Sequence, residues 1–113
     1  MAGEIASLND FFGNLSNHIV EKHLKGVTAT YQFKISGDGG GEWYVDVKDD
    51  GFSVSEGVHD SPSVTYEVPA PLYLKIINGK ANGRMAVLTR KMKVTGSIPA
   101  AMKMQKFLPP RKG

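Results

Sequence analysis

Three histidines and a group of acidic residues are the side chains of this sequence that could do chemistry. His18 and His23 lie five positions apart, so a helix carries them on different faces rather than on the shared face that metal ligands four apart need. His59 has no histidine nearby in the sequence. The chain has no cysteine, which excludes disulfides, thiolate metal sites and cysteine nucleophiles. We expect no metal site and no cofactor.

The glycine and aspartate clusters suggest phosphate or calcium loops by composition alone. Gly37–Gly41 lies between two alternating segments, and no Lys-Ser or Lys-Thr pair opens a helix after it, so it predicts a hairpin turn. Asp46, Asp49 and Asp50 lack the ligand spacing of an EF-hand and are typical of solvated turn residues. Because no local group of serine, histidine and acid stands out either, we expect the protein not to be an enzyme.

Hydrophobic periodicity predicts the elements that must position any site. From about Glu4 to Lys25, apolar residues recur at three- and four-residue spacings, which predicts one amphipathic helix or two shorter ones separated at Gly13 and Asn14. After Gly26 the period changes to two, which predicts four strands arranged as an antiparallel meander. The alternating apolar positions of these strands are Ala29, Tyr31, Phe33, Ile35, Trp43, Val45, Val47, Phe52, Val54, Val64, Tyr66 and Val68.

The remaining third predicts three helices and a fifth strand. Asn78-Gly79 is typical of a left-handed helix C-cap, and Ser97 is suited to cap the last helix. The predicted segments are Leu72–Ile77, Gly83–Thr89, a strand around Met92 and Val94, and Ile98–Leu108. The length of 113 residues suits a single domain with one core.

Charge is segregated along the chain. The net charge is +3, yet all eleven acidic residues lie between Glu4 and Glu67 with only four basic ones, and ten basic residues and no acid follow from Val68 onward. The basic part is expected to face something anionic, such as a phosphate-bearing ligand or an acidic membrane, unless pairs between the two halves cancel much of the charge. Residues 1–10 contain no basic residue and no apolar run, and no stretch is long enough to span a bilayer, so a cytoplasmic location is expected.

The apolar residues of the C-terminal third are the remaining candidates for a site, and every methionine except Met1 lies among them. They either fill a core or, because thioether side chains are flexible, line an adaptable cavity. These residues are Leu72, Leu74, Ile76, Ile77, Met85, Val87, Leu88, Met92, Val94, Ile98, Met102, Met104, Phe107 and Leu108.

Several strings, in this order, resemble the sterol carrier protein 2 family of lipid-binding domains over nearly the whole chain. They are Tyr31–Ile35, Glu42–Lys48, Ile77–Lys80, Arg90–Gly96 and Ala101–Gln105. The resemblance implies one α+β domain over residues 1–113, with a five-stranded, mostly antiparallel sheet covered by helices. It also implies an apolar tunnel between sheet and helices, which binds and transfers fatty acids, fatty acyl-CoA, sterol-like lipids or phospholipid without catalysis.

Candidate site residues combine positions matched to the family with apolar residues of the C-terminal third. The tunnel candidates are Trp43, Val45, Leu72, Ile76, Met85, Leu88, Met92, Val94, Met102, Met104 and Phe107. The candidates for contact with a lipid head group or an anionic membrane are Lys103, Lys106, Arg111 and Lys112.

The sequence departs from the family at two places. Arg90 stands where the family usually has glycine, which puts the local backbone geometry in question, and Arg111–Gly113 is not a peroxisomal signal of the Ser-Lys-Leu type.

Other functions stay open from the sequence. The main alternative is an interaction module that presents lipid substrates to a partner enzyme through its last helix. Another is an enzyme that acts on a lipid through His59 or an aspartate brought close by folding. Nucleic-acid binding is disfavoured because the aromatic residues lie mostly in the acidic half. We expect a monomer or a weak homodimer.

Overall fold

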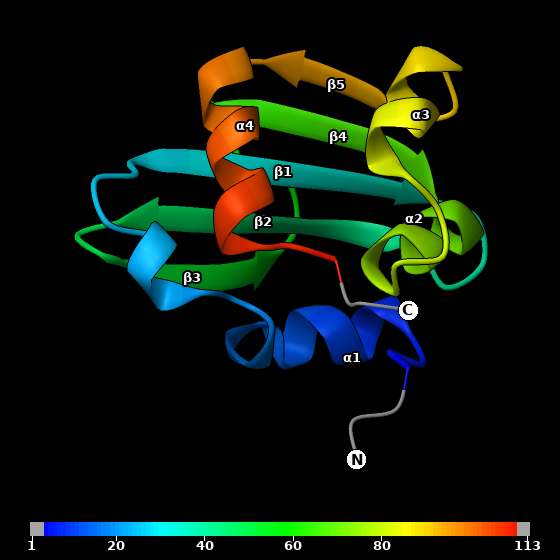
Figure 1. The fold of residues 1–113 in the computed structure, drawn as a ribbon, viewed down its shortest axis with the longest axis horizontal. Coiled ribbons are helices and arrows are strands. Elements are labelled where there is room, and N and C mark those ends of the chain that lie inside the picture. Colours follow the sequence, from blue (N-terminus) through cyan, green and yellow to red (C-terminus); the bar gives the residue numbers. More distant parts are fainter. Residues whose placement is uncertain (1–3, 111–113) are drawn as a thin grey trace.

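Five strands form one open sheet in the order β3-β2-β1-β4-β5 (Figure 1). The structure is a computed structural model that describes residues 4–110. Large apolar side chains alternate with polar ones along the strands, which places the core on one face. The strands are β1 Ala29–Ser36, β2 Gly41–Lys48, β3 Gly51–Glu56, β4 Val64–Pro69 and β5 Lys93–Gly96.

The sheet is mostly antiparallel, as predicted, but the expected four-stranded meander is wrong. β4 pairs with β1 in parallel, so the chain crosses from the edge strand β3 to the far side of β1. The crossing segment passes over the face of Gln32, whose buried side chain accepts from the His59 amide (2.7 Å) and donates to the Gly57 carbonyl (3.0 Å). A buried glutamine that bonds backbone groups of the crossover fixes a connection that alternation alone does not reveal.

The N-terminal segment is a broken helix. Its apolar stripe folds as α1 Leu8–Gly13 followed by two 3₁₀ turns, η1 Leu15–Asn17 and η2 Glu21–His23, rather than as one or two regular helices. The Ser7 hydroxyl caps α1 by accepting from the Asp10 amide (3.1 Å). The amide of Val20 then donates to the carbonyl of Phe107 (2.8 Å), which ties this segment to the end of the last helix.

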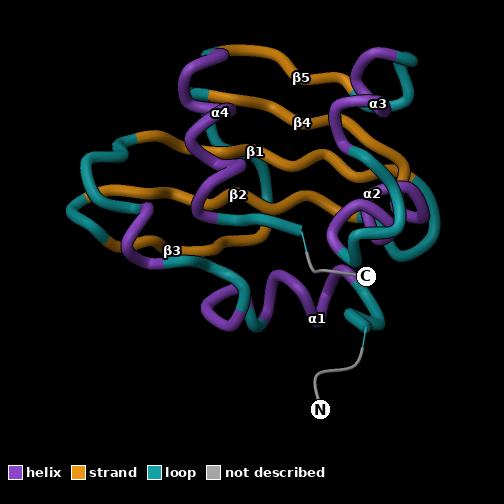
Figure 2. Tube along the Cα trace, viewed as in Figure 1, coloured by secondary structure: helices purple, strands orange, loops and turns teal. Residues whose placement is uncertain are grey.

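Three helices follow β4 and lie on the core face of the sheet (Figure 2). The predicted caps are confirmed, since Gly79 adopts a left-handed φ of 75° and Ser97 accepts from the Ala100 amide (3.2 Å). Arg90 also adopts a left-handed φ of 62°. The backbone at position 90 therefore keeps the left-handed conformation that glycine adopts freely, although this chain has arginine where the family usually has glycine. The helices are α2 Ala70–Ile77, α3 Gly83–Leu88 and α4 Ile98–Phe107.

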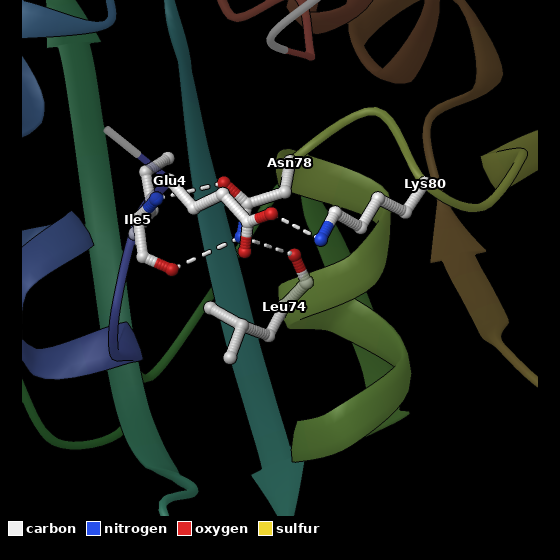
Figure 3. A network of polar contacts seen from close by, with 5 residues as sticks. All are labelled: Glu4, Ile5, Leu74, Asn78 and Lys80. Atoms are coloured by element: carbon white, nitrogen blue, oxygen red, sulfur yellow. Dashed lines mark hydrogen bonds and ion pairs between the residues drawn. The ribbon is translucent and has the colours of Figure 1, made fainter. Parts of the chain in front are cut away.

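The start of the chain is fixed to the end of α2 by Asn78 (Figure 3). The buried Asn78 side chain accepts from the amide of Ile5 (2.8 Å) and donates to the carbonyl of the same residue (3.0 Å). It also donates to the carbonyl of Leu74, and Lys80 forms an ion pair with Glu4 nearby. This group of contacts, the Asn78 clasp, holds one end of the α1 segment in place.

Candidate functional site

A cleft of about 620 Å³ opens between α1, η1 and the strands β2 and β3. Its volume falls within the range of small-molecule sites, roughly 300–1,000 Å³. Apolar side chains form much of its wall, and three short polar side chains, one glutamate and a glycine complete it. The lining residues are Phe12, Leu15, Trp43, Phe52 and Val54, with Asn9, Gly13, Ser16, Ser55 and Glu56.

The local sequence explains why these side chains meet. Phe12 and Leu15 are three positions apart on the buried stripe of the N-terminal segment. Phe52 and Val54 alternate along β3, and Val54 lies directly opposite Val45 of β2. Because β3 is an edge strand and stays half-buried, its apolar side chains are available to the cleft.

Aromatic rings connect the cleft with the interior beneath the helices. Phe12 stacks on Trp43 with ring centroids 4.5 Å apart and contacts Phe33 at 5.1 Å. Phe33 stacks on Tyr66 at 5.2 Å and contacts Tyr73 of α2 at 5.8 Å. These five rings, the aromatic array, form a continuous apolar layer from the cleft wall to α2.

Three tyrosines place hydroxyl groups in or beside this interior. The Tyr31 hydroxyl donates to the Ala100 carbonyl of α4 (2.7 Å), and burial raises the pKa of Tyr31 to about 12. Burial, and then the charge of Tyr31, raise the pKa of Tyr66 well above its ordinary value. Burial, and then the charge of Tyr66, do the same for the pKa of Tyr73. All three phenols are therefore neutral at physiological pH.

The tunnel candidates named from the sequence lie at three depths. Trp43 lines the cleft, and Val45, Met92 and Phe107 are buried in the core. Leu72, Ile76, Val94 and Met104 are half-buried and pack against it. Three others are exposed, namely Met85, Leu88 and Met102.

The structure therefore does not bring these candidates together in the cleft, although the core unites most of them. Of the basic candidates, Lys103 and Lys106 are exposed on α4. Arg111 and Lys112 lie outside the described residues.

The sequence reasoning named only Trp43 of the ten cleft residues, and the apolar residues that it missed are Phe12, Leu15, Phe52 and Val54. The sequence did show their apolar periodicity, which was interpreted as core packing. The missing information was that α1 lies against the β3 side of the sheet, a contact between segments about 40 positions apart.

Two of the three histidines, His18 and His59, make structural contacts, and His23 is exposed. The ring of His18 stacks on Phe11 with centroids 5.3 Å apart, and the ring of His59 packs edge-on against Tyr44 at 5.2 Å. His59 Nδ1 also accepts from the amide of Ser61 (3.0 Å). Within residues 4–110, no three potential ligands among histidines and acids gather as a metal site would require.

The β5 side of the sheet has a different surface. Met85 and Leu88 of α3 and Ile98 and Met102 of α4 are exposed, and the two helices flank β5 in Figure 1. The neighbouring basic side chains are exposed, and no acidic residue follows Glu67. We call this the β5-edge surface, and its residues are Met85, Leu88, Ile98 and Met102 with Arg84, Arg90, Lys91 and Lys93. The exposed Lys103 and Lys106 lie farther along α4, which runs from β5 toward β2 (Figure 1). No helix among residues 4–110 is both long enough and apolar enough to cross a bilayer.

Comparison with known proteins gives a consistent family match. The model of the SCP-2 sterol transfer family matches residues 8–109. The mouse protein named hydroxysteroid dehydrogenase-like protein 2 (Mus musculus) is 28% identical over 103 residues, which are 90% of this chain and 21% of the mouse protein. The chain thus spans about a fifth to a quarter of the length of the curated relatives that it matches.

Solved structures share the fold. Palmitated SCP2L2 from Aedes aegypti is 26% identical with a TM-score of 0.63, and the match covers 77% of this chain and 78% of that one. The sterol carrier protein domain 2 of Helicoverpa armigera is 24% identical with a TM-score of 0.64, over 86% of this chain and 75% of that one.

Proposed function

The chain belongs to the SCP-2 sterol transfer family, and we propose that it binds one lipid molecule in the apolar space between sheet and helices without changing it chemically. The proposed ligands are fatty acids, fatty acyl-CoA, sterol-like lipids or phospholipid, and transfer between membranes follows from reversible binding. The observation that carries the proposal is the cleft at α1 and β3, because the rings of Phe12 and Trp43 in its mixed polar and apolar wall continue through the aromatic array into the interior. The tunnel candidates that line or border this interior are proposed as ligand contacts.

Burial of a lipid chain supplies enough free energy for useful affinity. Each buried methylene contributes about 0.8 kcal/mol, so a chain of about sixteen carbons gains on the order of 10 kcal/mol before ordering costs. Those costs reduce the net affinity to roughly the micromolar range. The known palmitated SCP2L2 from Aedes aegypti, which has the same fold, supports a ligand of this size.

Native mass spectrometry of the purified protein, followed by extraction, tests whether lipid is bound. We expect about one fatty acid, sterol-like molecule or phospholipid per chain, and displacement of a fluorescent fatty acid by added palmitate. A protein that is free of lipid and does not bind the fluorescent probe contradicts the proposal.

A pair of valines on neighbouring segments localises the binding. Val54→Asp places a charge in the cleft and should lower affinity for the probe at least ten-fold, whereas Val58→Asp changes an exposed side chain of the crossover and should leave it unchanged. Thermal unfolding of both variants controls for loss of fold. Equal affinities would place the ligand elsewhere.

The β5-edge surface and the adjoining exposed side of α4, which carries Lys103 and Lys106, are proposed to make transient contact with anionic membranes. Exposed apolar side chains lie among lysines and arginines here, and no acidic residue follows Glu67 in the sequence. Such a surface is complementary to an anionic membrane, which offers both hydrocarbon and negative charge. Binding to phosphatidylserine vesicles should fall with salt and in Lys103→Glu/Lys106→Glu. The control is Lys34→Glu/Lys48→Glu, which changes exposed lysines of β1 and β2. Equal binding by both double variants contradicts the proposed contact.

The alternative is that α4 docks on a protein and presents lipid to a partner enzyme. Exposed Ile98 and Met102 support it, as does the greater length of relatives named as dehydrogenase-like proteins. A protein-docking surface should cause concentration-dependent self-association that Met102→Asp removes, whereas a membrane-docking surface leaves the chain monomeric without vesicles. Sedimentation equilibrium separates the two and tests the predicted monomer or weak homodimer. A cytoplasmic location also stays a prediction.

A further inference from the structure

Two tyrosine side chains of the core have hydroxyls that bond no other group among residues 4–110. Tyr66 of β4 is 5% exposed and Tyr73 of α2 is 4% exposed, and both rings pack on Phe33. The hydroxyl of Tyr31 bonds the Ala100 carbonyl, but no hydrogen bond among residues 4–110 uses the hydroxyl of Tyr66 or Tyr73. The donor and acceptor capacity of these two hydroxyls is therefore not used by other protein groups and is available to a ligand or a water molecule.

These two hydroxyls border open space rather than packed atoms. Among the described residues, no side-chain oxygen or nitrogen is both sealed from a water-sized group and without a hydrogen bond. Because the hydroxyls of Tyr66 and Tyr73 lack a bond, each must face space that a water-sized group reaches. Phe33 belongs to the same aromatic layer and stacks on Tyr66 with an angle of 12° between the ring planes. Packing in this layer therefore does not itself require a ring that carries a hydroxyl.

The surroundings of the pair suit an uncharged oxygen and not a carboxylate. Every lysine and arginine among residues 4–110 is exposed, so no cation is present in the interior to balance a buried negative charge. Burial keeps both phenols neutral by raising the pKa of each. The rings of Tyr66 and Tyr73 lie 5.2 and 5.8 Å from the ring of Phe33, which places the two tyrosines near each other. A neutral phenol donates to a ketone or hydroxyl oxygen and accepts from a hydroxyl.

We infer that the hydroxyls of Tyr66 and Tyr73 hold the uncharged oxygen-bearing end, a hydroxyl or a ketone, of an otherwise apolar lipid. This inference rests on the proposed function and narrows its ligand class. A lipid with one such group buries it at the tyrosine pair, with its hydrocarbon against the aromatic array. An ionised fatty acid would bury a carboxylate there without a balancing cation, so its carboxylate stays at the surface.

Hexadecanol, hexadecane and palmitate, which all have sixteen carbons, test the inference by their ability to displace a fluorescent probe. Hexadecanol should bind about ten-fold more tightly than hexadecane, because one or two hydrogen bonds form to groups that otherwise lack them. Tyr66→Phe and Tyr73→Phe should each reduce this ratio, and the double variant should bring it close to one without weakening hexadecane. The matched control is Tyr44→Phe, which removes the hydroxyl of the tyrosine that contacts His59 and should leave the ratio unchanged.

The outcomes separate this inference from the proposed function. If no sixteen-carbon compound binds, both fail. If hexadecanol and hexadecane bind equally, or if the double variant keeps the wild-type ratio, the proposed lipid binding is unaffected but the inference is wrong. The tyrosine pair then does not bind the oxygen of the ligand, for instance because it holds only a water molecule. Tighter binding of palmitate than of hexadecanol, lost in the double variant, would also overturn the preference for an uncharged group. The wild-type ratio requires no variant, so a failure of the double variant to fold does not remove the test.

Discussion

The two edges of the sheet carry apolar residues in opposite ways. At the β3 edge, aromatic rings are covered by α1 and line a cleft, and the nearest charges are acidic, such as Glu56. At the β5 edge, aliphatic side chains and methionines are exposed, with Leu88 at 75%, among basic residues. The comparison teaches that apolar composition alone does not identify a binding site, because the site depends on which edge a neighbouring segment covers.

Truncation at the two edges should separate stability from surface function, with the largest effect at the covered one. Phe12→Ala should lower the free energy of unfolding by about 3–5 kcal/mol, since it leaves a cavity under Trp43. Leu88→Ala should change it by less than about 0.5 kcal/mol, because that side chain is exposed. Urea denaturation measures both. Similar losses would show that α3 is packed as firmly as α1 and would remove the contrast.

The same substitution at two asparagines, one that holds the chain near α1 and one that caps α3, compares the two regions further. Asn78→Ala should cost about 2–3 kcal/mol, because it leaves backbone groups of Ile5 buried without partners. Asn82→Ala removes only the cap that accepts from the amides of Arg84 and Met85 and should cost about 1 kcal/mol. Guanidinium unfolding checks the order. A larger loss at Asn82 would contradict the view that the chain is fastened more tightly near α1.

High pH should weaken the helix-covered interior that lies between the two edges. The folded chain keeps its buried phenols protonated above the ordinary pKa of 10.0, with Tyr31 at about 12, so their contribution is fully present below pH 10 and is lost as the pH rises toward 12. Each such group steepens the loss by about 1.4 kcal/mol per pH unit. Stability measured against pH should fall less steeply in Tyr73→Phe than in Tyr44→Phe. Identical slopes for the two variants contradict this.

A small gain in stability is expected at the β5 edge. Arg90→Gly should raise stability by about 0.5–1 kcal/mol, because glycine adopts the left-handed φ of 62° without the strain of a Cβ atom. Arg90→Ala removes the same charge without relieving the backbone and serves as the control. Thermal unfolding distinguishes them, and an equal gain in both variants would attribute the effect to charge repulsion among the basic residues.

The sequence predicted the elements of this fold better than their contacts. Local signals such as the Asn78-Gly79 cap, the Ser97 cap and the glycine turn are settled within a few residues, and the structure confirms the two caps. The parallel pairing of β1 with β4 depends on a crossover that Gln32 fixes from the opposite face of the sheet. A polar position in an alternating strand gives no sign of such a contact.

The candidate site shows the same limit. Trp43 could be named from its matched position, but Phe12 and Val54 join it only through the packing of α1 beside β3. Arg90 shows the reverse case, where a departure from the family pattern marked a position of special geometry correctly.

The fastening of α1 at both ends has a consequence for how fast a ligand exchanges. The Asn78 clasp holds Ile5, and the Val20 amide is bonded to Phe107, so the segment between these points is held at each side. The opposite wall of the cleft is β3, which pairs on one side only and is half-buried. Opening of the cleft therefore costs less at the edge strand than at the helix. Ligand release should follow the fraying of β3, so hydrogen exchange of the β3 amides and the ligand off-rate should rise and fall together.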